Sequence, residues 1–517
     1  MHRTRRTSAL LATPLVVGLW SGQSFAQAPD EANRLKDSAS SPLEARNADF
    51  YIMANGLATG RYEAFDAIVV DPDGNTYDPD AAINTQLRLG AEAGFNLHKA
   101  FKLKAVYEHD VYTGVASGGE TDLEATGLPN DEQQPDDELR KAYGELTTPW
   151  ARVTAGFQTS HWGLGLLSND GAHGWTPGSA YFGDPRSGDR VLRYALGTGL
   201  PDDILPLKVF FAYDEVQDDD ILVGDDEANQ FVVAVKYDDQ FGKGPNPTRL
   251  EMGAYAAFRE QTAIDEQVTD VTAVDVFLRY RTRLDDVQID TAFEGVYITG
   301  ETEWAPTVNR QTHDVRQAGG LLRLNLSWGS FGVNTDMLYA TGDQNFDDDQ
   351  QNALKLDPNL EMGLILFRQM NAAATARAVT RASDPDLLGV PNEDLDRFPT
   401  RGSVSNTALV FPRFWWRVAK IELYGGPLVA FSEVQAADPR NTRLNGGDPQ
   451  TALGGTPGVY LGTEFDLGIR YRTNIGFARM MFGLEGGYFA PGSAFTDATG
   501  GTPDPVMGGR FIGQIRL

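Results

Sequence analysis

The final ten residues, 508–517, alternate polar and apolar side chains up to the carboxyl terminus. One face holds the apolar side chains and the other the polar ones: Phe511, Ile515 and Leu517 against Arg510, Gln514 and Arg516. Successive side chains of a β-strand point to opposite faces, so this segment suits a wall between lipid and a wet lumen. The pattern predicts the last strand of a transmembrane β-barrel.

The same alternation recurs along the chain, with charged residues gathered on one face. It is clearest in Ile83–Leu97, Val274–Arg283 and Val459–Arg472, where Phe277 falls out of phase in the second segment. Fourteen further segments are similar: 48–59, 101–112, 137–147, 150–158, 189–197, 206–216, 228–238, 247–260, 286–299, 317–328, 331–342, 403–417, 420–433 and 476–489. Their length of about 9–14 residues suits tilted membrane strands. The sequence therefore predicts an all-β fold, an antiparallel transmembrane β-barrel of about 18 strands over residues 48–517.

The connections between these segments alternate between short turns and long acidic loops. The short turns are His98-Lys99, Pro149-Trp150, Leu284-Asp285, Gly329-Ser330 and Thr473-Asn474, and the long loops are 60–82, 113–136, 159–188, 300–316, 434–457 and 490–507. Bacterial barrels place short turns in the periplasm and long loops outside. We therefore expect the acidic loops to be extracellular.

One region breaks the alternation. Two long connections, 343–360 and 373–402, flank the apolar segment Glu361–Met370, which has no period of two. A strand there would make nineteen and place the termini on opposite sides, which is untypical of single-chain bacterial barrels. We interpret 343–402 as one long extracellular insertion whose apolar middle folds into or over the pore mouth, and the alternative is an unrecognised twentieth strand. The expected pore-mouth residues of the insertion are Leu364, Phe367 and Arg368.

The N-terminus has the pattern of a secretory signal peptide. Three arginines precede an apolar stretch from about Ala9 to Trp20, and small-residue cleavage sites follow at Ala26 and Ala28. We expect 1–28 to be removed and 29–47 to form a short periplasmic linker. The alternative is an uncleaved membrane anchor, but the apolar stretch is short for a bilayer.

The chain is strongly acidic, with a formal net charge of -28, and it contains no cysteine. The lack of cysteine excludes disulfides, thiolate metal sites and a lipid-modified N-terminus. The acidic residues gather in runs such as Asp71–Gly74, Asp218–Asp220 and Asp347–Asp349. Such runs form solvated loop surface, and the alternative is that divalent cations bridge them to anionic lipid headgroups. The negative charge argues against a nucleic-acid partner.

Two parts of the chain resemble alginate-export-type outer-membrane porins. Glu138–Leu146, Ala151–Gln158 and Trp162-Gly163 are similar to a hairpin in which an Arg-x-Ala-Tyr strand precedes a strand ending in Gly-Arg-Gln. Phe157 stands where that family carries arginine. The second part consists of Ala340–Asp343, Phe346, Asp357-Pro358 and Gly363–Phe367.

The resemblance covers less than a fifth of the chain. It implies an eighteen-stranded porin, and it does not imply alginate as the solute. Residues 160–171 are also similar to uncharacterised outer-membrane proteins of myxobacteria.

The charge-bearing faces of the strands predict the lining of the lumen. On the clearest strands these faces carry twelve basic and ten acidic residues. This balance favours ion pairs between neighbouring strands, and the alternative is a solute-guiding ladder of Arg279, Arg281 and Arg283. The expected lumen-lining residues are Arg88, Glu92, Asp275, Arg279, Arg281, Arg283, Asp290, Glu294, Arg323, Asp336, Glu464, Asp466, Arg470, Arg472, Arg479 and Glu485.

The sequence does not favour an enzyme. No histidines have a metal-ligand spacing, so we expect no metal, cofactor or catalytic residue. Ser160 beside His161 is the nearest nucleophilic candidate. Adjacent strand residues point to opposite faces, so these two side chains can meet only in a loop.

Together the patterns predict a porin in the outer membrane of a Gram-negative bacterium, for passive diffusion or export of small hydrophilic solutes or saccharides. Expected partners are outer-membrane lipids, lipopolysaccharide, periplasmic chaperones and the barrel-assembly machinery. The alternatives are a non-conducting structural or adhesive barrel and, less favoured, an outer-membrane hydrolase. A channel for hydrophobic solutes would need an N-terminal plug, which the short polar segment Pro29–Asn47 does not resemble.

Overall fold

A computed structural model describes the chain from residue 45 to its end, with gaps. The described ranges are 45–46, 50–79, 81–98, 101–118, 136–172, 175–183, 188–199, 206–219, 226–242, 247–263, 266–304, 312–344, 348–382 and 399–517. The expected signal peptide 1–28 and all of the linker 29–47 except 45–46 lie outside the described residues. So do 345–347 and 383–398 of the insertion.

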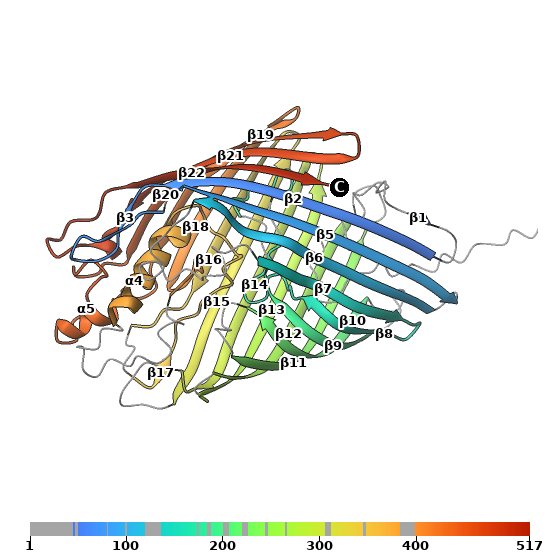
Figure 1. Ribbon diagram of the computed structural model, residues 1–517, viewed down its shortest axis with the longest axis horizontal. Helices are drawn as coiled ribbons and strands as arrows, with labels where there is room; N and C mark the ends of the chain where they lie inside the picture. Colours follow the sequence, from blue (N-terminus) through green and yellow to red (C-terminus); the bar gives the residue numbers. More distant parts are fainter. Residues whose placement is uncertain are drawn as a thin grey trace, which may run out of the picture.

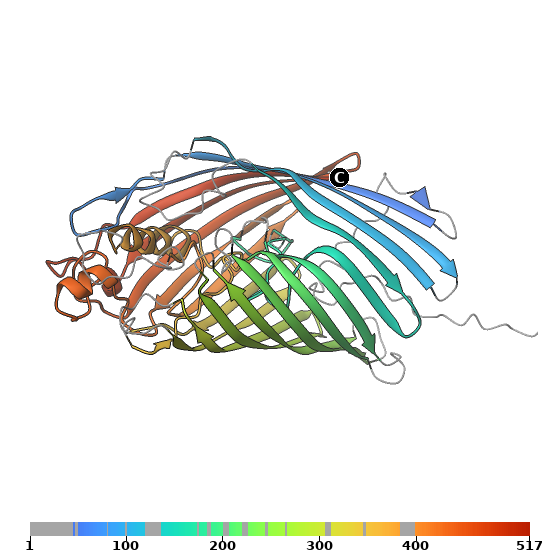
Figure 2. The same cartoon turned by 60° about the horizontal axis from the view of Figure 1, so that its bottom comes forward.

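One sheet of 20 strands closes on itself as a barrel (Figures 1 and 2). Two of them, β1 (Ala45–Arg46) and β17 (Gln350–Gln351), are two-residue strands at the rim, which leaves 18 in the wall. The wall strands are β2 (Phe50–Phe65), β5 (Ala82–His98), β6 (Phe101–Gly118), β7 (Asp136–Thr147), β8 (Ala151–Thr159), β9 (Arg190–Gly199), β10 (Leu207–Asp218), β11 (Glu227–Phe241), β12 (Thr248–Thr262), β13 (Val268–Leu284), β14 (Val287–Thr302), β15 (His313–Trp328), β16 (Phe331–Ala340), β18 (Thr407–Val418), β19 (Ile421–Phe431), β20 (Tyr460–Ile475), β21 (Ala478–Pro491) and β22 (Val506–Arg516).

Each wall strand pairs antiparallel with the next, and the first pairs with the last. β2 and β22 close the ring from Leu57↔Arg516 to Phe65↔Gly508. The predicted antiparallel barrel of 18 strands is therefore confirmed. The alternating last ten residues of the chain lie in or next to the closing strand.

Burial follows the alternation of the sequence. In β13, Val274, Val276 and Leu278 are 41 to 44% exposed, whereas Asp275 between them is fully buried. A lipid-facing surface requires this outward apolar face. Phe277 lies on the same inner face as the charged residues of β13. It is buried in one cluster with Trp162, so this apolar side chain is covered from inside the barrel.

Aromatic side chains gather beside the short hairpins. Trp328 and Phe331 flank the β15–β16 turn, and Phe331 stacks on Trp416 with ring centroids 6.1 Å apart and planes 6° from parallel. Trp150, beside the β7–β8 turn, is 73% exposed. Such residues form the aromatic girdle that transmembrane barrels carry at the membrane interface.

Helices occur only in the long connections of the described chain. They are η1 (Leu366–Asn371), α4 (Ala372–Ala382), α5 (Pro439–Leu444) and η3 (Ser493–Phe495), and the small hairpin β3 (Ile68–Val69) with β4 (Thr76–Tyr77) lies in another such connection. Both views show α4 and α5 together at one end of the barrel (Figures 1 and 2). No helix among the described residues is both long enough and apolar enough to cross a membrane.

The insertion adds no strand to the wall. β16 and β18 pair directly from Phe331↔Trp416 to Ala340↔Thr407, so the alternative of a twentieth strand is wrong. The described part of the insertion instead packs inside the barrel. Its buried apolar residues form one cluster with inward-facing apolar residues of the wall: Leu354, Leu356, Leu360, Met362, Leu364, Ile365, Leu366, Phe367 and Met370 with Leu338, Leu409, Phe411, Leu428 and Phe489.

Candidate functional site

The described part of the connection between β8 and β9, residues 160–172, 175–183 and 188–189, folds into the barrel instead of standing outside it. We name it the inner loop. Leu166, Ala180 and Phe182 on this loop are at most 1% exposed and belong to the same apolar cluster as the insertion. The lumen therefore contains two inward-folded segments, the inner loop and the insertion.

A pair of wall carboxyl groups on β13 and β14 anchors the start of the inner loop. Glu294 accepts hydrogen bonds from the backbone N–H groups of Leu164 and Leu166, the second at 3.2 Å. The indole Nε1 of Trp162 donates to Asp275 Oδ1 at 2.9 Å. Because both carboxyl groups are fully buried, these donors replace the water that the wall would otherwise hold there.

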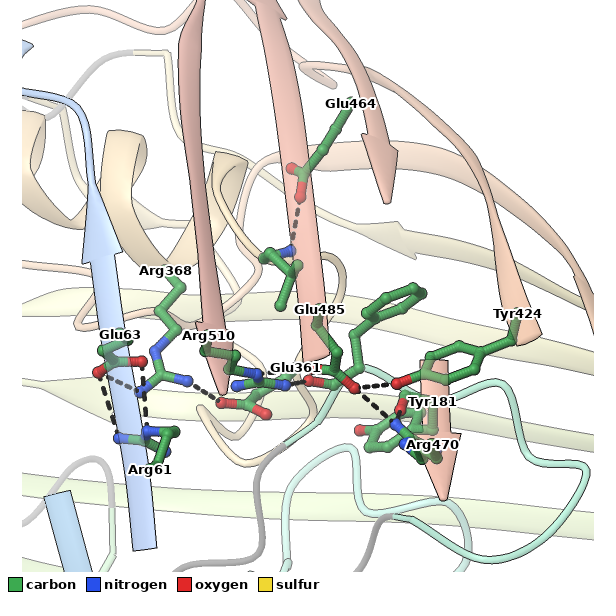
Figure 3. Close-up of polar contacts among 12 residues, drawn as sticks. Arg61, Glu63, Tyr181, Glu361, Arg368, Tyr424, Glu464, Arg470, Glu485 and Arg510 are labelled. Carbon is green, nitrogen blue, oxygen red and sulfur yellow. Dashed lines mark hydrogen bonds and ion pairs between the residues drawn. The ribbon is translucent and has the colours of Figure 1, made fainter. Parts of the chain in front are cut away.

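A carboxyl group on β20, that of Glu464, anchors the insertion. Glu464 Oε1 accepts the N–H groups of Leu364 at 2.5 Å and Ile365 at 2.9 Å, and Oε2 accepts that of Leu366 at 2.8 Å. Glu464 is fully buried, and so is Asp466 on the same strand. Figure 3 shows Glu464 above the row of lumen charges, with its bond to the insertion.

Both anchors rest on a glycine at the point of closest approach. Gly163 has φ +57° and Gly363 has φ +79°, a conformation that L-residues rarely adopt. A Cβ added to Gly163 would lie 2.3 Å from a Glu294 oxygen, and one added to Gly363 would lie 2.8 Å from a Glu464 oxygen. The segments read Gly-Leu-Gly-Leu at 163–166 and Gly-Leu-Ile-Leu at 363–366, so one local device is used twice.

The far side of the inner loop is held by arginines of β20 and β22. Arg470 donates to the Tyr181 carbonyl and Arg510 to the Phe182 carbonyl. The same two arginines pair with Glu485 at 2.8 Å and 2.6 Å (Figure 3). Arg470 is fully buried and Arg510 is 2% exposed, so both hold the loop rather than present charge to a solute.

The two inward-folded segments also contact each other. The backbone N–H of Asp357, in the insertion, donates to the Leu166 carbonyl of the inner loop at 2.8 Å. Leu166 is thus bonded to the wall through its N–H and to the insertion through its carbonyl. Through this contact the inner loop and the insertion form one packed unit that occupies part of the lumen.

All sixteen expected lumen residues lie on the face of their strands opposite the exposed apolar side chains. Six are fully buried: Asp275, Glu294, Asp336, Glu464, Asp466 and Arg470. Glu485 and Arg88 are also buried, Glu92, Arg279, Arg281, Asp290, Arg323 and Arg472 are half-buried, and Arg283 and Arg479 near the short turns are exposed. The structure therefore buries half of these side chains, eight of the sixteen.

Ion pairs join many of these residues across neighbouring strands. Arg279 binds Asp290 through two bonds of 2.8 and 2.6 Å, and Arg323 binds Asp336 at 2.8 Å. Arg281 pairs with the buried Glu251. Arg283, the third residue of the arginine ladder considered above, donates to the Asp285 carbonyl in its own hairpin at 3.0 Å.

The expected pore-mouth residues have different surroundings. Leu364 and Phe367 are each 1% exposed and lie in the apolar cluster inside the barrel. Arg368 pairs with Glu361 at 2.9 Å and lies 3.8 Å from Glu63 of β2 (Figure 3). Arg368 thus extends the row of lumen charges across to the first strand.

A pocket remains between the inner loop and strands β9 to β14. Its empty volume is about 1090 Å³. The wall contributes mostly apolar residues, among them Phe210, Val232, Ala234, Tyr255 and Ala257. The inner loop contributes Ser160, Trp162 and Ser168, and the insertion contributes Lys355 and Asp357. A concave site with an apolar wall and a few polar groups is typical of small-molecule binding.

The charged residues of this pocket are nearly balanced. Arg193 binds Asp214 through bonds of 2.7 and 2.8 Å, and Arg259 pairs with Asp219. Burial raises the pKa of Asp189 well above its ordinary value, and the nearby carboxylates of Asp357 and Asp219 raise it further. Burial and these neighbours therefore disfavour the ionised form of the Asp189 carboxyl group.

The nucleophilic candidate does not form a catalytic arrangement with its neighbour. The Ser160 hydroxyl bonds to Ser168 Oγ at 2.8 Å and accepts a hydrogen bond from Arg193 at 3.3 Å. His161 Nδ1 lies 3.7 Å from Asp170 Oδ1. Within the described ranges, no group of three or more histidine, aspartate or glutamate side chains is placed to hold a metal ion.

The sequence analysis missed the inner loop and the residues that face it. It expected 159–188 to be an outer loop, although Leu164–Leu167 is as apolar as the segment that singled out the insertion. The same apolar pattern therefore marks this loop as a second segment that needs cover. The partners Glu251, Asp214 and Arg193 lie on strands that were predicted, but their pairing depends on register.

Comparison with known proteins places the fold. No protein-family model matches the sequence, and no curated protein matches it significantly. Among solved structures, the chain is similar to a BenF-like porin from Pseudomonas fluorescens Pf-5, with TM-score 0.52 and 11% identity over 90% of this chain and 98% of that chain. Pseudomonas aeruginosa OccK9 (OpdG) gives TM-score 0.52 and 8% identity, with the same coverage. Pseudomonas aeruginosa OccK2 (OpdF) gives 0.51 and 11%, over 90% of this chain and 97% of that chain.

These neighbours are Occ-type and BenF-like porins, and none of the three is an alginate-export porin. At such low identity the likeness concerns the fold alone. The barrel has the fold of outer-membrane porins, as the sequence predicts, with the inner loop, the insertion and the pocket as its internal features.

Proposed function

We propose that the protein is an outer-membrane channel through which small hydrophilic solutes cross by passive diffusion. The observation that carries the proposal is the pocket between the inner loop and strands β9 to β14. A barrel with a purely structural or adhesive role needs no such space beside a filled lumen. Here the inner loop and the insertion are bonded to the wall and to each other, and they leave this space open along strands β9 to β14.

We also propose that the solute is not a polyanion and that the protein is not a hydrolase. The sequence resemblance to alginate-export-type porins does not imply alginate, an anionic polysaccharide, as the solute. Lumen arginines that are buried and paired, such as Arg413 with Asp336, do not offer the cationic surface that a polyanion requires. Ser160 and His161 have the separate partners described above, which supports a channel rather than a hydrolase.

We also propose that outer-membrane lipids and lipopolysaccharide surround the exposed apolar face, and that periplasmic chaperones and the barrel-assembly machinery deliver the chain. Exposed outward residues such as Leu467, at 70%, need an apolar environment. An unfolded precursor with so many apolar positions needs protection from water before insertion.

Single-channel recording tests the proposal. Purified, refolded protein is added to a planar lipid bilayer, and we expect discrete conductance steps. The matched control is the same preparation unfolded by heat, which gives no steps. A folded preparation without steps contradicts the channel and favours a non-conducting barrel. Hydrolysis of phospholipid or casein by the same preparation would point to an enzyme.

A further inference from the structure

The pocket has one apolar side and one polar side. Small and aromatic side chains of β10 to β13 form the apolar side, including Phe210, Ala234, Tyr255 and Ala273. Hydroxyl, amide and charged groups from the inner loop, β9, β11 and β12 form the other: Ser160, Ser168, Arg193, Gln230 and Arg259. A ligand that fits must therefore have an apolar face and a polar periphery.

Aromatic rings form a corner in the apolar side. Trp162 of the inner loop meets Tyr255 of β12 edge to face, with centroids 5.2 Å apart and planes at 82°. Phe210 lies beside them in the same apolar cluster, with the Arg193 guanidinium over its ring at 5.6 Å. The electron-rich faces of such rings attract the weakly positive C–H groups of a saturated ring.

Four of the charged groups that line the pocket are already paired. Arg193 is bound to Asp214 and Arg259 to Asp219, while Asp218 pairs with Arg190 at 3.0 Å. Paired carboxylates and guanidinium groups keep planar arrays of donors and acceptors in fixed positions. Neighbouring hydroxyl groups of a solute can bind such arrays without displacing the partner. A charged solute gains little from them, because each charge is already compensated.

The total charge around the pocket is also close to zero. Three bases line the pocket, Arg193, Arg259 and Lys355, together with four acids, Asp189, Asp218, Asp219 and Asp357, and burial raises the pKa of Asp189. Neither an anion nor a cation is therefore favoured over an uncharged solute. The pocket is partly open, so a ligand in it can also contact the space beyond the lining residues.

We infer that this pocket binds a neutral saccharide, with one sugar face on the Trp162, Phe210 and Tyr255 corner and its hydroxyl groups on Gln230, Ser160 and the paired charges. The inference rests on the proposed channel function and names its solute class. The pocket is then a binding site on the inner wall that a sugar occupies transiently as it crosses the barrel.

Three probes that share one ring test the charge preference: glucose, glucuronate and glucosamine. They are added separately to the protein in a planar bilayer, and interruptions of the ion current are recorded. We expect glucose to interrupt the current at a concentration at least tenfold lower than either charged probe. Equal or stronger block by glucuronate or glucosamine overturns the inference but leaves the channel intact.

Equilibrium dialysis of radiolabelled glucose against detergent-solubilised protein gives a second readout that does not depend on conductance. Saturable binding that exceeds binding of the charged probes supports the inference even if no channel opens. No saturable binding together with normal conductance steps overturns the inference alone. Missing conductance steps bear only on the proposed function, so the two failures are distinguishable.

Two variants locate the site. Tyr255→Ala removes one aromatic face, and Gln230→Ala removes an amide that otherwise donates to Asp214 at 3.1 Å. We expect each to weaken glucose binding about tenfold or more. The matched control is Tyr143→Ala on β7, an inward-facing tyrosine whose ring lies near Lys104, away from the pocket. Weakening by the control as large as that by Tyr255→Ala contradicts the assignment. Heat-modified gel mobility confirms that each variant is folded.

Discussion

At the scale of single residues, the parity of a position decides its environment. In β20, Leu467 is 70% and Ile469 is 39% exposed on the outer face, whereas Glu464 and Asp466 on the inner face are fully buried. The buried carboxyl group of Glu464 is tolerated because backbone N–H groups of the insertion replace its water. A one-residue change in register would exchange the two environments.

Ile469→Arg tests this parity. The variant places a guanidinium on the lipid face, which costs ~2–4 kcal/mol near the membrane midplane. We expect the heat-modified mobility of the folded barrel to be lost at a lower temperature than in the parent protein. The matched control is Asn474→Arg, at an exposed position beside the β20–β21 turn. If Ile469→Arg unfolds at the parent temperature, the outward assignment of Ile469 is wrong.

At the scale of elements, two loops that lie far apart in sequence are fastened in the same way. The inner loop uses Glu294 on β14 and the insertion uses Glu464 on β20, and each glutamate accepts successive backbone N–H groups that follow a glycine with positive φ. Three donors on one carboxylate satisfy groups that have no secondary-structure partner. The anchors make the loops part of the barrel interior.

Glu464→Ala tests the second anchor. It leaves the N–H groups of Leu364, Ile365 and Leu366 without their acceptor, and each unsatisfied buried group costs about 1–3 kcal/mol. We expect faster hydrogen exchange over 361–371, measured by mass spectrometry, while the wall strands keep their protection. Glu92→Ala, which removes a half-buried inner-face glutamate bonded to Tyr51, serves as the control. Unchanged exchange over 361–371 would falsify the anchoring role.

Deletion of 345–400 tests whether the wall needs the insertion. β16 and β18 pair over ten residues without it, so we expect the shortened chain to fold into a barrel with heat-modified mobility. Its single-channel conductance should exceed that of the parent, because the filling of the lumen is reduced. Failure to fold under conditions that refold the parent would mean that the barrel depends on the packing of Leu364 and Phe367.

The wall could be predicted from the sequence because it follows a period of two. Each of the eighteen predicted strands corresponds to one in the structure, and even Phe277 keeps its inward parity. The filling of the lumen could not be predicted with the same completeness. Arg470 bonds to the Tyr181 carbonyl, 289 positions earlier in the chain, and no local pattern determines where a long loop will cross a barrel. The apolar run at 364–367 indicates that this segment packs against another surface, but it does not identify that surface.

At the scale of the whole molecule, the inner surface is divided. From β15 to β22 the wall presents apolar residues such as Leu338, Phe411 and Leu428 to the insertion, and all three are at most 3% exposed. Along β9 to β14 the wall faces the pocket. One part of the circumference therefore supports a packed interior, and another part borders the space that remains.

Because of this division, the number of strands does not determine the width of the passage. An eighteen-strand ring alone suggests a broad, central bore, but the insertion and the inner loop are bonded to each other through Asp357 and Leu166 and leave space on one side. A solute moving through such a barrel follows a track along the wall, off the axis of the cylinder. The ring of strands then serves as a support. The width of the path depends on a few loop residues, which can be substituted without altering any strand.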